Sequence, residues 1–155
     1  MTRKSWIVLV VLAILAASVI GFLYWNSPER RIRAVLTDGK AAIEAKDLDR
    51  AMSHVSLKYR DENGLAYMTV KKLLKMAFDQ FEGFDLRLTN VKLEIEKDRT
   101  VVHADLDVIG TNKGEKSYLI GSREEPVSIR ITLVKETMRW QVLSVDGIRL
   151  PFAEF

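Results

Sequence analysis

Apolar residues recur about every 3.6 positions in three segments of the first half of the chain, which is the spacing of an amphipathic helix. The first predicted helix covers 28–45. A second begins after Asp47, whose carboxylate can cap free N–H groups, and ends near Ser56. A third begins with a capping Thr69 and ends at Gly83. We therefore expect three successive helices at the start of the domain.

In the second half of the chain the spacing changes from 3.6 to 2, which is typical of strands with one buried face. The alternation changes phase at Thr89-Asn90, and such a slip predicts a β-bulge or a sharp bend. Turn residues at 97–99, 112–114 and 135–138 separate the alternating runs and favour hairpins. The predicted strands are 86–95, 102–108, 116–121, 127–133 and 139–145.

Near the N-terminus, 20 consecutive residues carry no charge. A helix of that length is roughly 30 Å long, which is the thickness of the hydrocarbon core of a bilayer. Trp6 at one end and Tyr24 and Trp25 at the other are side-chain types that prefer the water–lipid interface. The pattern predicts a transmembrane anchor over 6–26, preceded by a basic tail over 1–5.

A cleaved signal peptide is the alternative interpretation of this segment. Ala16-Ala17-Ser18 offers small residues of the kind that a signal peptidase accepts. The apolar run continues beyond them for longer than a usual signal core, and this length favours an uncleaved anchor.

The charges flanking the anchor disagree about its orientation. The basic tail favours an N-terminus in the cytoplasm, whereas Arg30, Arg31 and Arg33 favour the opposite orientation by simple counting. Because these arginines fall in a predicted folded helix, their weight for the orientation is reduced. The basic tail followed by an apolar run is typical of a bacterial export signal, so we expect the domain in the periplasm, on a bacterial inner membrane. The three arginines are then expected near the phospholipid head groups, where they can attract anionic lipids. A solvated helix face is the alternative.

Composition excludes several classes of site. The 155 residues include no cysteine and two histidines, His54 and His103, which excludes disulfides, thiolate metal sites and a histidine-rich zinc site. The net charge is +3, and 22 basic against 21 acidic residues remain once the N-terminal tail is left out. Such a balance argues against a nucleic-acid binder. We expect no metal and no cofactor.

The order of elements predicts an α+β domain over 27–150, in which three N-terminal helices pack on a curved antiparallel β-sheet behind the anchor. The apolar tail 151–155 contains Phe152 and Phe155, which either dock back on the domain or meet a partner.

This arrangement resembles the nuclear-transport-factor-2-like (NTF2-like) fold, also called the cystatin-like α+β cone, which includes SnoaL-type and ketosteroid-isomerase-type proteins. The resemblance covers about 28–147. It rests on the helix order, on AKDLD at 45–49, on YRDENG at 59–64 and on WQVLSVDG at 140–147. It implies a cavity between the concave sheet face and the helices, where enzymes of the family place an acid or a base, although many members are non-catalytic.

Asp61 stands near the position at which isomerase-type members carry a general-base aspartate. Its alternative role is to make a local turn or cap backbone N–H groups beside Asn63-Gly64. Tyr59 and His54 are the other catalytic candidates, and for both an ordinary packing or surface role is the alternative.

The resemblance implies a ligand pocket, and the side chains expected to line it are Tyr59, Tyr67, Phe78 and Trp140. Core packing is the alternative for each aromatic ring. His103, Asp105 and Asp107 share one face of a predicted strand, and the alternation of their apolar neighbours assigns them to the solvated face.

The leading hypothesis is a membrane-tethered, non-enzymatic domain that binds a partner protein or a small apolar ligand in the cell envelope. Oligomerisation to a homodimer through the open sheet face is compatible with it. The alternatives are an isomerase- or dehydratase-like enzyme using Asp61, and an accessory or assembly subunit of a membrane complex.

Overall fold

The computed structural model describes the backbone of residues 3–25 and 27–149 and the side chains of residues 10–24 and 27–149. Four helices precede the sheet in this part of the chain: α1 (Arg3–Trp25), α2 (Pro28–Glu44), α3 (Leu48–Ser53) and α4 (Tyr67–Gln80). The tail 151–155, with Phe152 and Phe155, lies outside the described residues, as do the side chains of Trp6 and Trp25.

The five strands form one antiparallel sheet in the order β1-β2-β4-β5, and β3 pairs with the far half of β2. Their bounds are β1 (Gly83–Ile95), β2 (Arg99–Asn112), β3 (Glu115–Ile120), β4 (Val127–Glu136) and β5 (Arg139–Asp146). Because β2 pairs with β1, β3 and β4, it is the central strand.

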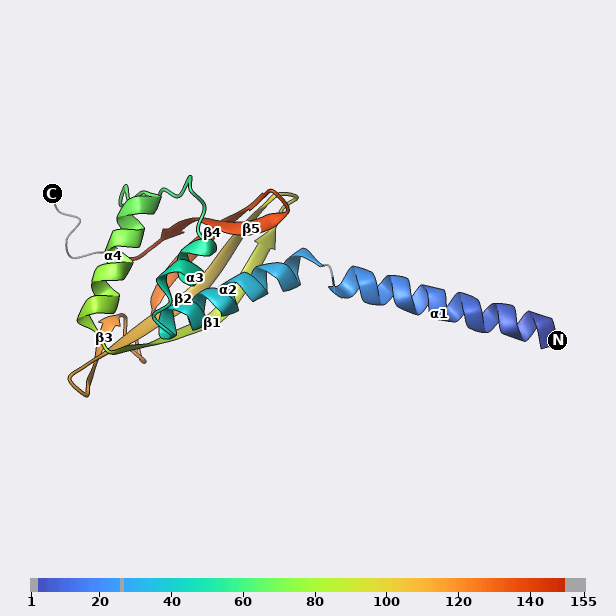
Figure 1. The fold of residues 1–155 in the computed structure, drawn as a ribbon, viewed down its shortest axis with the longest axis horizontal. Helices are drawn as coiled ribbons and strands as arrows, with labels where there is room; N and C mark the ends of the chain where they lie inside the picture. Colours follow the sequence, from blue (N-terminus) through green and yellow to red (C-terminus); the bar gives the residue numbers. More distant parts are fainter. Residues whose placement is uncertain (1–2, 26, 150–155) are drawn as a thin grey trace.

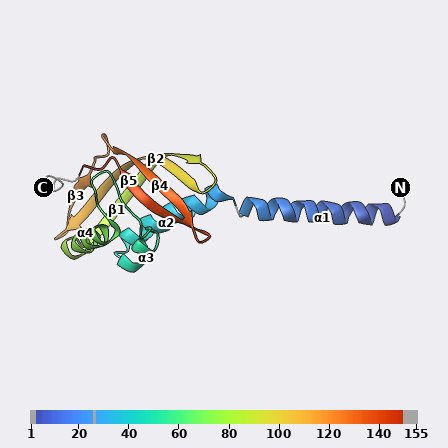
Figure 2. The ribbon, with the colours of Figure 1, turned by 90° about the horizontal axis from the view of Figure 1, so that it is seen from above.

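Helices α2, α3 and α4 lie on one face of the sheet, and α1 extends away from the domain (Figures 1 and 2). On α2, Ile32 and Ala42 are fully buried, as expected for the apolar stripe of an amphipathic helix. The sheet contributes the inward-facing side chains of its central and neighbouring strands. The buried core cluster consists of Ile32, Val102, Ala104, Leu106, Val108, Ile129, Ile131, Leu133 and Trp140.

The α+β class, the antiparallel sheet and the three packed helices agree with the sequence prediction. The carboxylate of Asp47 caps α3 by accepting from the backbone N–H of Arg50 at 3.1 Å. The predicted start of the third helix is wrong, because α4 begins at Tyr67 with Ala66 as its N-cap. The Ala66 carbonyl accepts the first helical hydrogen bond, from the Val70 N–H, which places Thr69 inside the first turn.

The predicted phase slip in the first strand is confirmed. The pairing of β1 with β2 shifts register between Thr89 and Lys92, and Asn90 adopts a left-handed conformation with φ of 52°. Asparagine tolerates that conformation better than most residues. The bulge keeps the apolar side chains on both sides of it directed at the core.

The free edge of β1 is covered by a side chain from α2. Glu44 accepts a hydrogen bond at 3.1 Å from the backbone N–H of Leu86 and pairs with Lys40 at 2.7 Å. An edge strand with unpaired N–H groups can recruit another strand, so this contact protects the sheet as well as fixing α2 upon it.

The expectation of a single spanning helix finds no support in the part of the chain that the structure describes. Among the residues whose side chains are described, no one helix is both long and apolar enough to cross a bilayer. Val10–Tyr24 and Pro28–Glu44 pass the test together as a pair bent by 44°.

The hydroxyl of Thr100 is an unsatisfied polar group in the core. Thr100 is fully buried on β2, and its Oγ1 atom has no hydrogen-bond partner among the described residues. We expect Thr100→Val, which keeps the shape and removes the hydroxyl, to raise the free energy of unfolding by about 1 kcal/mol. Urea denaturation of the two proteins measures this difference.

Val102→Thr is the matched control, because Val102 is equally buried on the same strand. Adding a hydroxyl there is expected to lower the free energy of unfolding by about 1–3 kcal/mol. Equal effects of the two substitutions would contradict this account of Thr100.

Candidate functional site

The segment 54–65, which holds the catalytic candidates, runs along the outer edge of β5. The Val142 N–H donates to the His54 carbonyl at 2.7 Å, and the Ser56 N–H donates to the Val142 carbonyl at 2.9 Å. The Arg60 N–H donates to the Leu143 carbonyl at 3.1 Å. This irregular segment therefore satisfies the second edge of the sheet, as a strand would.

The carboxylate of Asp61 is occupied by its own loop. Its Oδ1 atom accepts from the backbone N–H groups of Asn63 and Leu65, both at 3.0 Å. Its Oδ2 atom accepts from the Tyr59 hydroxyl at 2.9 Å. These contacts match the alternative reading of Asp61 as a turn-forming residue, since a general base needs a free oxygen facing a substrate.

Tyr59 joins this loop to β5. Its side chain is buried, and its hydroxyl donates to Asp61 and accepts from the Val145 N–H at 3.2 Å. Burial, followed by the hydrogen bond to the Asp61 carboxylate, raises the pKa of Tyr59 above its usual range. The hydroxyl therefore stays protonated and acts as a structural link.

His54 contacts a different group from the other two candidates. Its Nε2 atom lies 2.5 Å from the Asp38 carboxylate of α2, and Arg50 of α3 also pairs with that carboxylate. The hydrogen bond from Arg50, followed by that from His54, lowers the pKa of Asp38 to about 2. The three side chains fasten α3 to α2. Of the three catalytic candidates, only Tyr59 and Asp61 are brought into direct contact.

The aromatic residues predicted to line a pocket are mostly in the core. Tyr59, Phe78 and Trp140 are buried, and the Phe78 ring packs against Phe84 with their centroids 5.6 Å apart. Tyr67 is partly buried in the first turn of α4. None of these four side chains lines either of the two hollows described below.

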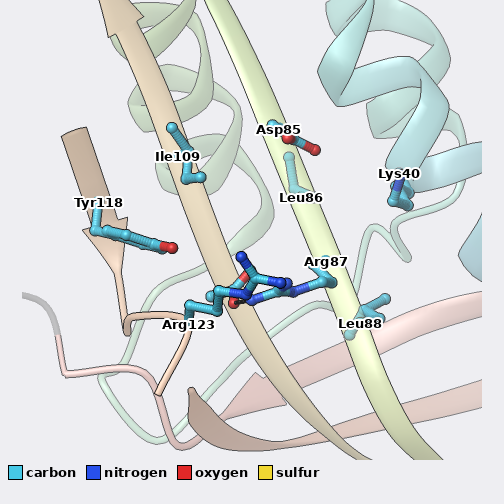
Figure 3. Close-up of a pocket in the computed structure, with 9 residues that line it drawn as sticks. Lys40, Asp85, Leu86, Arg87, Leu88, Ile109, Tyr118 and Arg123 are labelled. Atoms are coloured by element: carbon cyan, nitrogen blue, oxygen red, sulfur yellow. Dashed lines mark hydrogen bonds and ion pairs between the residues drawn. The ribbon is translucent and has the colours of Figure 1, made fainter. Parts of the chain in front are cut away.

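The larger hollow has a volume of about 400 Å³ and lies beside β1, β2 and β3 (Figure 3). Its polar lining has both signs of charge: Lys40, Arg87 and Arg123 are basic and Asp85 and Asp107 are acidic. An open hollow with this mixed lining does not provide the dry, apolar surroundings that tune a catalytic carboxylate.

Asp107 corrects one sequence expectation. It lies on the sheet face away from the helices, yet only 4% of it is exposed, because Arg87 of the neighbouring strand pairs with its carboxylate. The alternation of apolar and polar residues predicted the correct face of the sheet for Asp107, but it did not predict that this side chain is buried.

Asp105 and His103 remain nearer the solvent on the same face. Asp105 accepts from Asn90 at 2.8 Å and from Ser128 at 2.9 Å, and these hydrogen bonds lower its pKa. A second hollow of about 220 Å³ is lined in part by His103, Arg130 and Asp146. Within residues whose side chains are described, no group of three histidine, aspartate or glutamate side chains is placed to hold a metal ion.

The Asp38 cluster has a defined pH dependence. A folded-state pKa lowered from 3.8 to about 2 means that the ionised carboxylate stabilises the fold. This stability is present above about pH 4 and is lost as the pH falls towards 2. We expect wild type to exceed Asp38→Asn in free energy of unfolding at neutral pH and to lose that advantage in acid, as measured by urea denaturation across pH.

A matched comparison makes the same substitution in a protein that already carries Arg50→Gln. Since Arg50 is the main cause of the lowered pKa of Asp38, Asp38→Asn should change the free energy of unfolding less in that protein than in wild type. If the difference in free energy of unfolding between wild type and Asp38→Asn stays constant from pH 7 to about pH 2, the ionised Asp38 carboxylate does not have this role.

The Tyr59 hydroxyl is expected to contribute to stability. Tyr59→Phe removes the partner of the Val145 N–H and of the Oδ2 atom of Asp61, so the free energy of unfolding should fall by about 1–3 kcal/mol. Tyr67→Phe is the control, on a tyrosine that is less buried. Denaturation that is unchanged in Tyr59→Phe would contradict the assignment.

Comparisons with known proteins identify the fold. No family model matches the sequence, and no curated protein matches it. An NTF2-like protein with a cystatin-like fold from Novosphingobium aromaticivorans superposes with a TM-score of 0.63 at 11% identity, covering 88% of this chain and 90% of that one. A protein provisionally named a dehydratase of the NTF2-like family, from Streptomyces avermitilis, gives 0.64 at 12% identity, covering 80% and 100%.

A Bdellovibrio bacteriovorus protein, Bd1075, also superposes with a TM-score of 0.64 at 11% identity, over 78% of this chain. This chain spans 41% of the length of that protein. At such identities the similarity concerns the fold alone. The chain therefore has the NTF2-like, cystatin-like α+β fold that the order of its helices and strands predicts.

Proposed function

We propose that this protein is a membrane-tethered, non-enzymatic NTF2-like domain of the cell envelope, and that its domain binds a partner protein. The observation that carries the proposal is the exposure of α1. This helix extends from the domain as a separate rod (Figure 1), and its apolar side chains face outward.

The exposed fractions of these side chains are large for apolar residues. Ile20 is 67% exposed, Phe22 69% and Leu23 64%, and Leu12, Ile14 and Leu15 are each 57–60% exposed. An uncovered apolar patch of this length is strongly unfavourable in water, and it becomes favourable when lipid or another apolar surface covers it. Together with the uncharged run in the sequence, this supports a bilayer anchor.

The flanking residues of α1 support an interfacial position for its C-terminal end. The guanidinium of Arg30 lies 5.8 Å from the centroid of the Tyr24 ring. Tyrosine rings and arginines are both favoured at the level of the lipid head groups. Arg33 pairs with Glu29 at 3.2 Å, in an exposed contact on the first turns of α2.

Two observations support a binding role over an enzymatic one. The oxygens of Asp61 are engaged by Tyr59, Asn63 and Leu65. The described hollows are open and mixed in charge, which suits neither proton abstraction nor a small apolar ligand. Exposed apolar side chains, Met68 and Met76 on α4 and Leu57 in the segment 54–65, offer contact area for a protein partner.

A dehydratase-like activity is the second candidate. It is favoured by the superposition on the provisionally named dehydratases from Streptomyces avermitilis and Novosphingobium aromaticivorans, the latter with a TM-score of 0.65 at 13% identity. The local hydrogen bonds of Asp61 weigh against it, so we rank it below the binding role.

The tether is tested by fractionating bacterial cells that produce the full chain. Wild-type protein should remain with the membrane pellet after extraction at alkaline pH. Ile14→Arg with Leu15→Arg places two charges in the middle of the run, at a cost of about 5–7 kcal/mol on insertion scales, and should release the protein into the soluble fraction.

The swapped variant, Ile14→Leu with Leu15→Ile, is the matched control and should stay in the pellet. A phosphatase fused after residue 155 reports the side of the membrane, and its activity is expected in the periplasm. Wild-type protein that is wholly soluble after cell lysis would exclude the proposed tether.

A further inference from the structure

Three segments meet at the end of the domain from which α1 departs. They are the first turns of α2 (29–33), the β1–β2 turn (96–99) and the β4–β5 turn (135–139), and Figures 1 and 2 show the two hairpin ends on either side of the start of α2. The Lys135 N–H donates to the Asp98 carbonyl at 2.9 Å, which ties the two turns together. We call these three segments the proximal surface.

The basic excess of the domain is concentrated on the proximal surface. Its segments carry seven basic and four acidic side chains, whereas the rest of residues 5–155 carries 15 basic and 17 acidic ones. One of the four acids, Glu136, is engaged by the Ser56 hydroxyl at 2.9 Å. Lys97, Arg99 and Arg139 are exposed. The end nearest α1 is therefore positive, while the remainder of the domain is slightly negative.

The β4–β5 turn has residues that turn geometry alone would not favour. Thr137 and Met138 have φ of 47° and 68°, the left-handed conformations of a two-residue hairpin turn that asparagine and glycine occupy most easily. The β2–β3 hairpin at the opposite end follows that preference, with Gly114 at its second left-handed position. A β-branched residue in this region is strained, and strained positions often have a functional reason.

The strained turn presents a large apolar side chain to the outside. Met138 is 75% exposed, more than any other apolar side chain of the sheet or of α4 that the structure describes as exposed. A flexible thioether chain adapts well to an irregular apolar environment. Exposed basic groups and a protruding apolar side chain at the same end of the domain match the head groups and the acyl boundary of an anionic bilayer.

We propose that the proximal surface docks on anionic phospholipid head groups, with Met138 entering the interfacial layer. This inference rests on the proposed tether, because α1 would place the surface next to the membrane that it spans. The occupant is the lipid surface itself and not a second protein, since the surface adjoins the exposed apolar helix and has the complementary charge.

The absence of cysteine makes a direct test possible. Full chains carrying Met138→Cys, Met68→Cys or Ile20→Cys are labelled with an environment-sensitive fluorophore and reconstituted into vesicles of phosphatidylcholine, with or without phosphatidylglycerol. Met68 is the matched methionine control, because it is 69% exposed and belongs to α4, which lies at the end of the domain away from α1 (Figure 1). Quenching by iodide measures the exposure of each label to water.

In anionic vesicles the label at 138 should be quenched about threefold less than the label at 68, and raising the salt concentration should reduce this protection. Changing Lys97, Arg99 and Arg139 together to Gln should abolish it. The same changes at Lys113, Lys116 and Arg123, which lie on or near the opposite hairpin, should leave it intact.

Equal quenching at 138 and 68 in anionic vesicles would overturn the docking, and so would protection at 138 that does not depend on phosphatidylglycerol. The label at 20 separates this result from a failure of the tether. If position 20 is shielded while 138 is open, the tether stands and the docking is wrong. If position 20 is open to iodide, the tether fails and the docking fails with it.

Discussion

The fold depends on the apolar inner face of β2. Val102, Ala104, Leu106 and Val108 alternate along this strand and are all buried, and β2 pairs with β1, β3 and β4. Each pairing must keep the same face turned to the helices, because a slip of one residue would move the whole apolar set into water. The bulge at Asn90 preserves this alignment along the length of β1.

The backbone groups on the two outer edges of the sheet need hydrogen-bond partners, and several polar side chains are used to provide or hold them. Glu44 of α2 accepts a hydrogen bond from β1, while the segment 54–65 pairs with the backbone of β5. In that segment the fold uses Tyr59 and Asp61 to close a loop and fasten it to β5. A group held by two or three internal hydrogen bonds is costly to redirect towards a substrate. Tyr59 and Asp61 are thus less available for contact with a substrate because they hold the segment that covers the edge of β5.

The parts of this arrangement that were predictable from sequence are local. The cap by Asp47, the bulge at Asn90 and the alternation along β2 each depend on neighbours within a few residues, so the sequence pattern contains them. The start of α4 was misplaced because a threonine is a good cap in general, whereas here the chain already turns at Ala66.

The contacts that defined the site were not predictable in this way. Asp38 and His54 are 16 positions apart, and Arg87 and Asp107 are 20 apart on two strands. No pattern among neighbouring residues in the sequence indicates that either pair will be in contact. Alternation gives the face on which a carboxylate lies, but the burial of Asp107 depends on which residue stands opposite on the next strand. Such pairs emerge only once register and helix packing are known.

The short connection between α1 and α2 strengthens the inference about the proximal surface. Helix α1 ends at Trp25 and α2 begins at Pro28, so extended chain between them could reach only about 10 Å. A domain on so short a connection cannot move far from the level at which α1 ends. Its nearest end is then held at high effective concentration against whatever covers α1, so weak individual contacts suffice for docking. The hairpin with Thr137 and Met138 lies at this end, whereas the Gly114 hairpin lies at the other, as expected if lipid contact selected the residues of the turn.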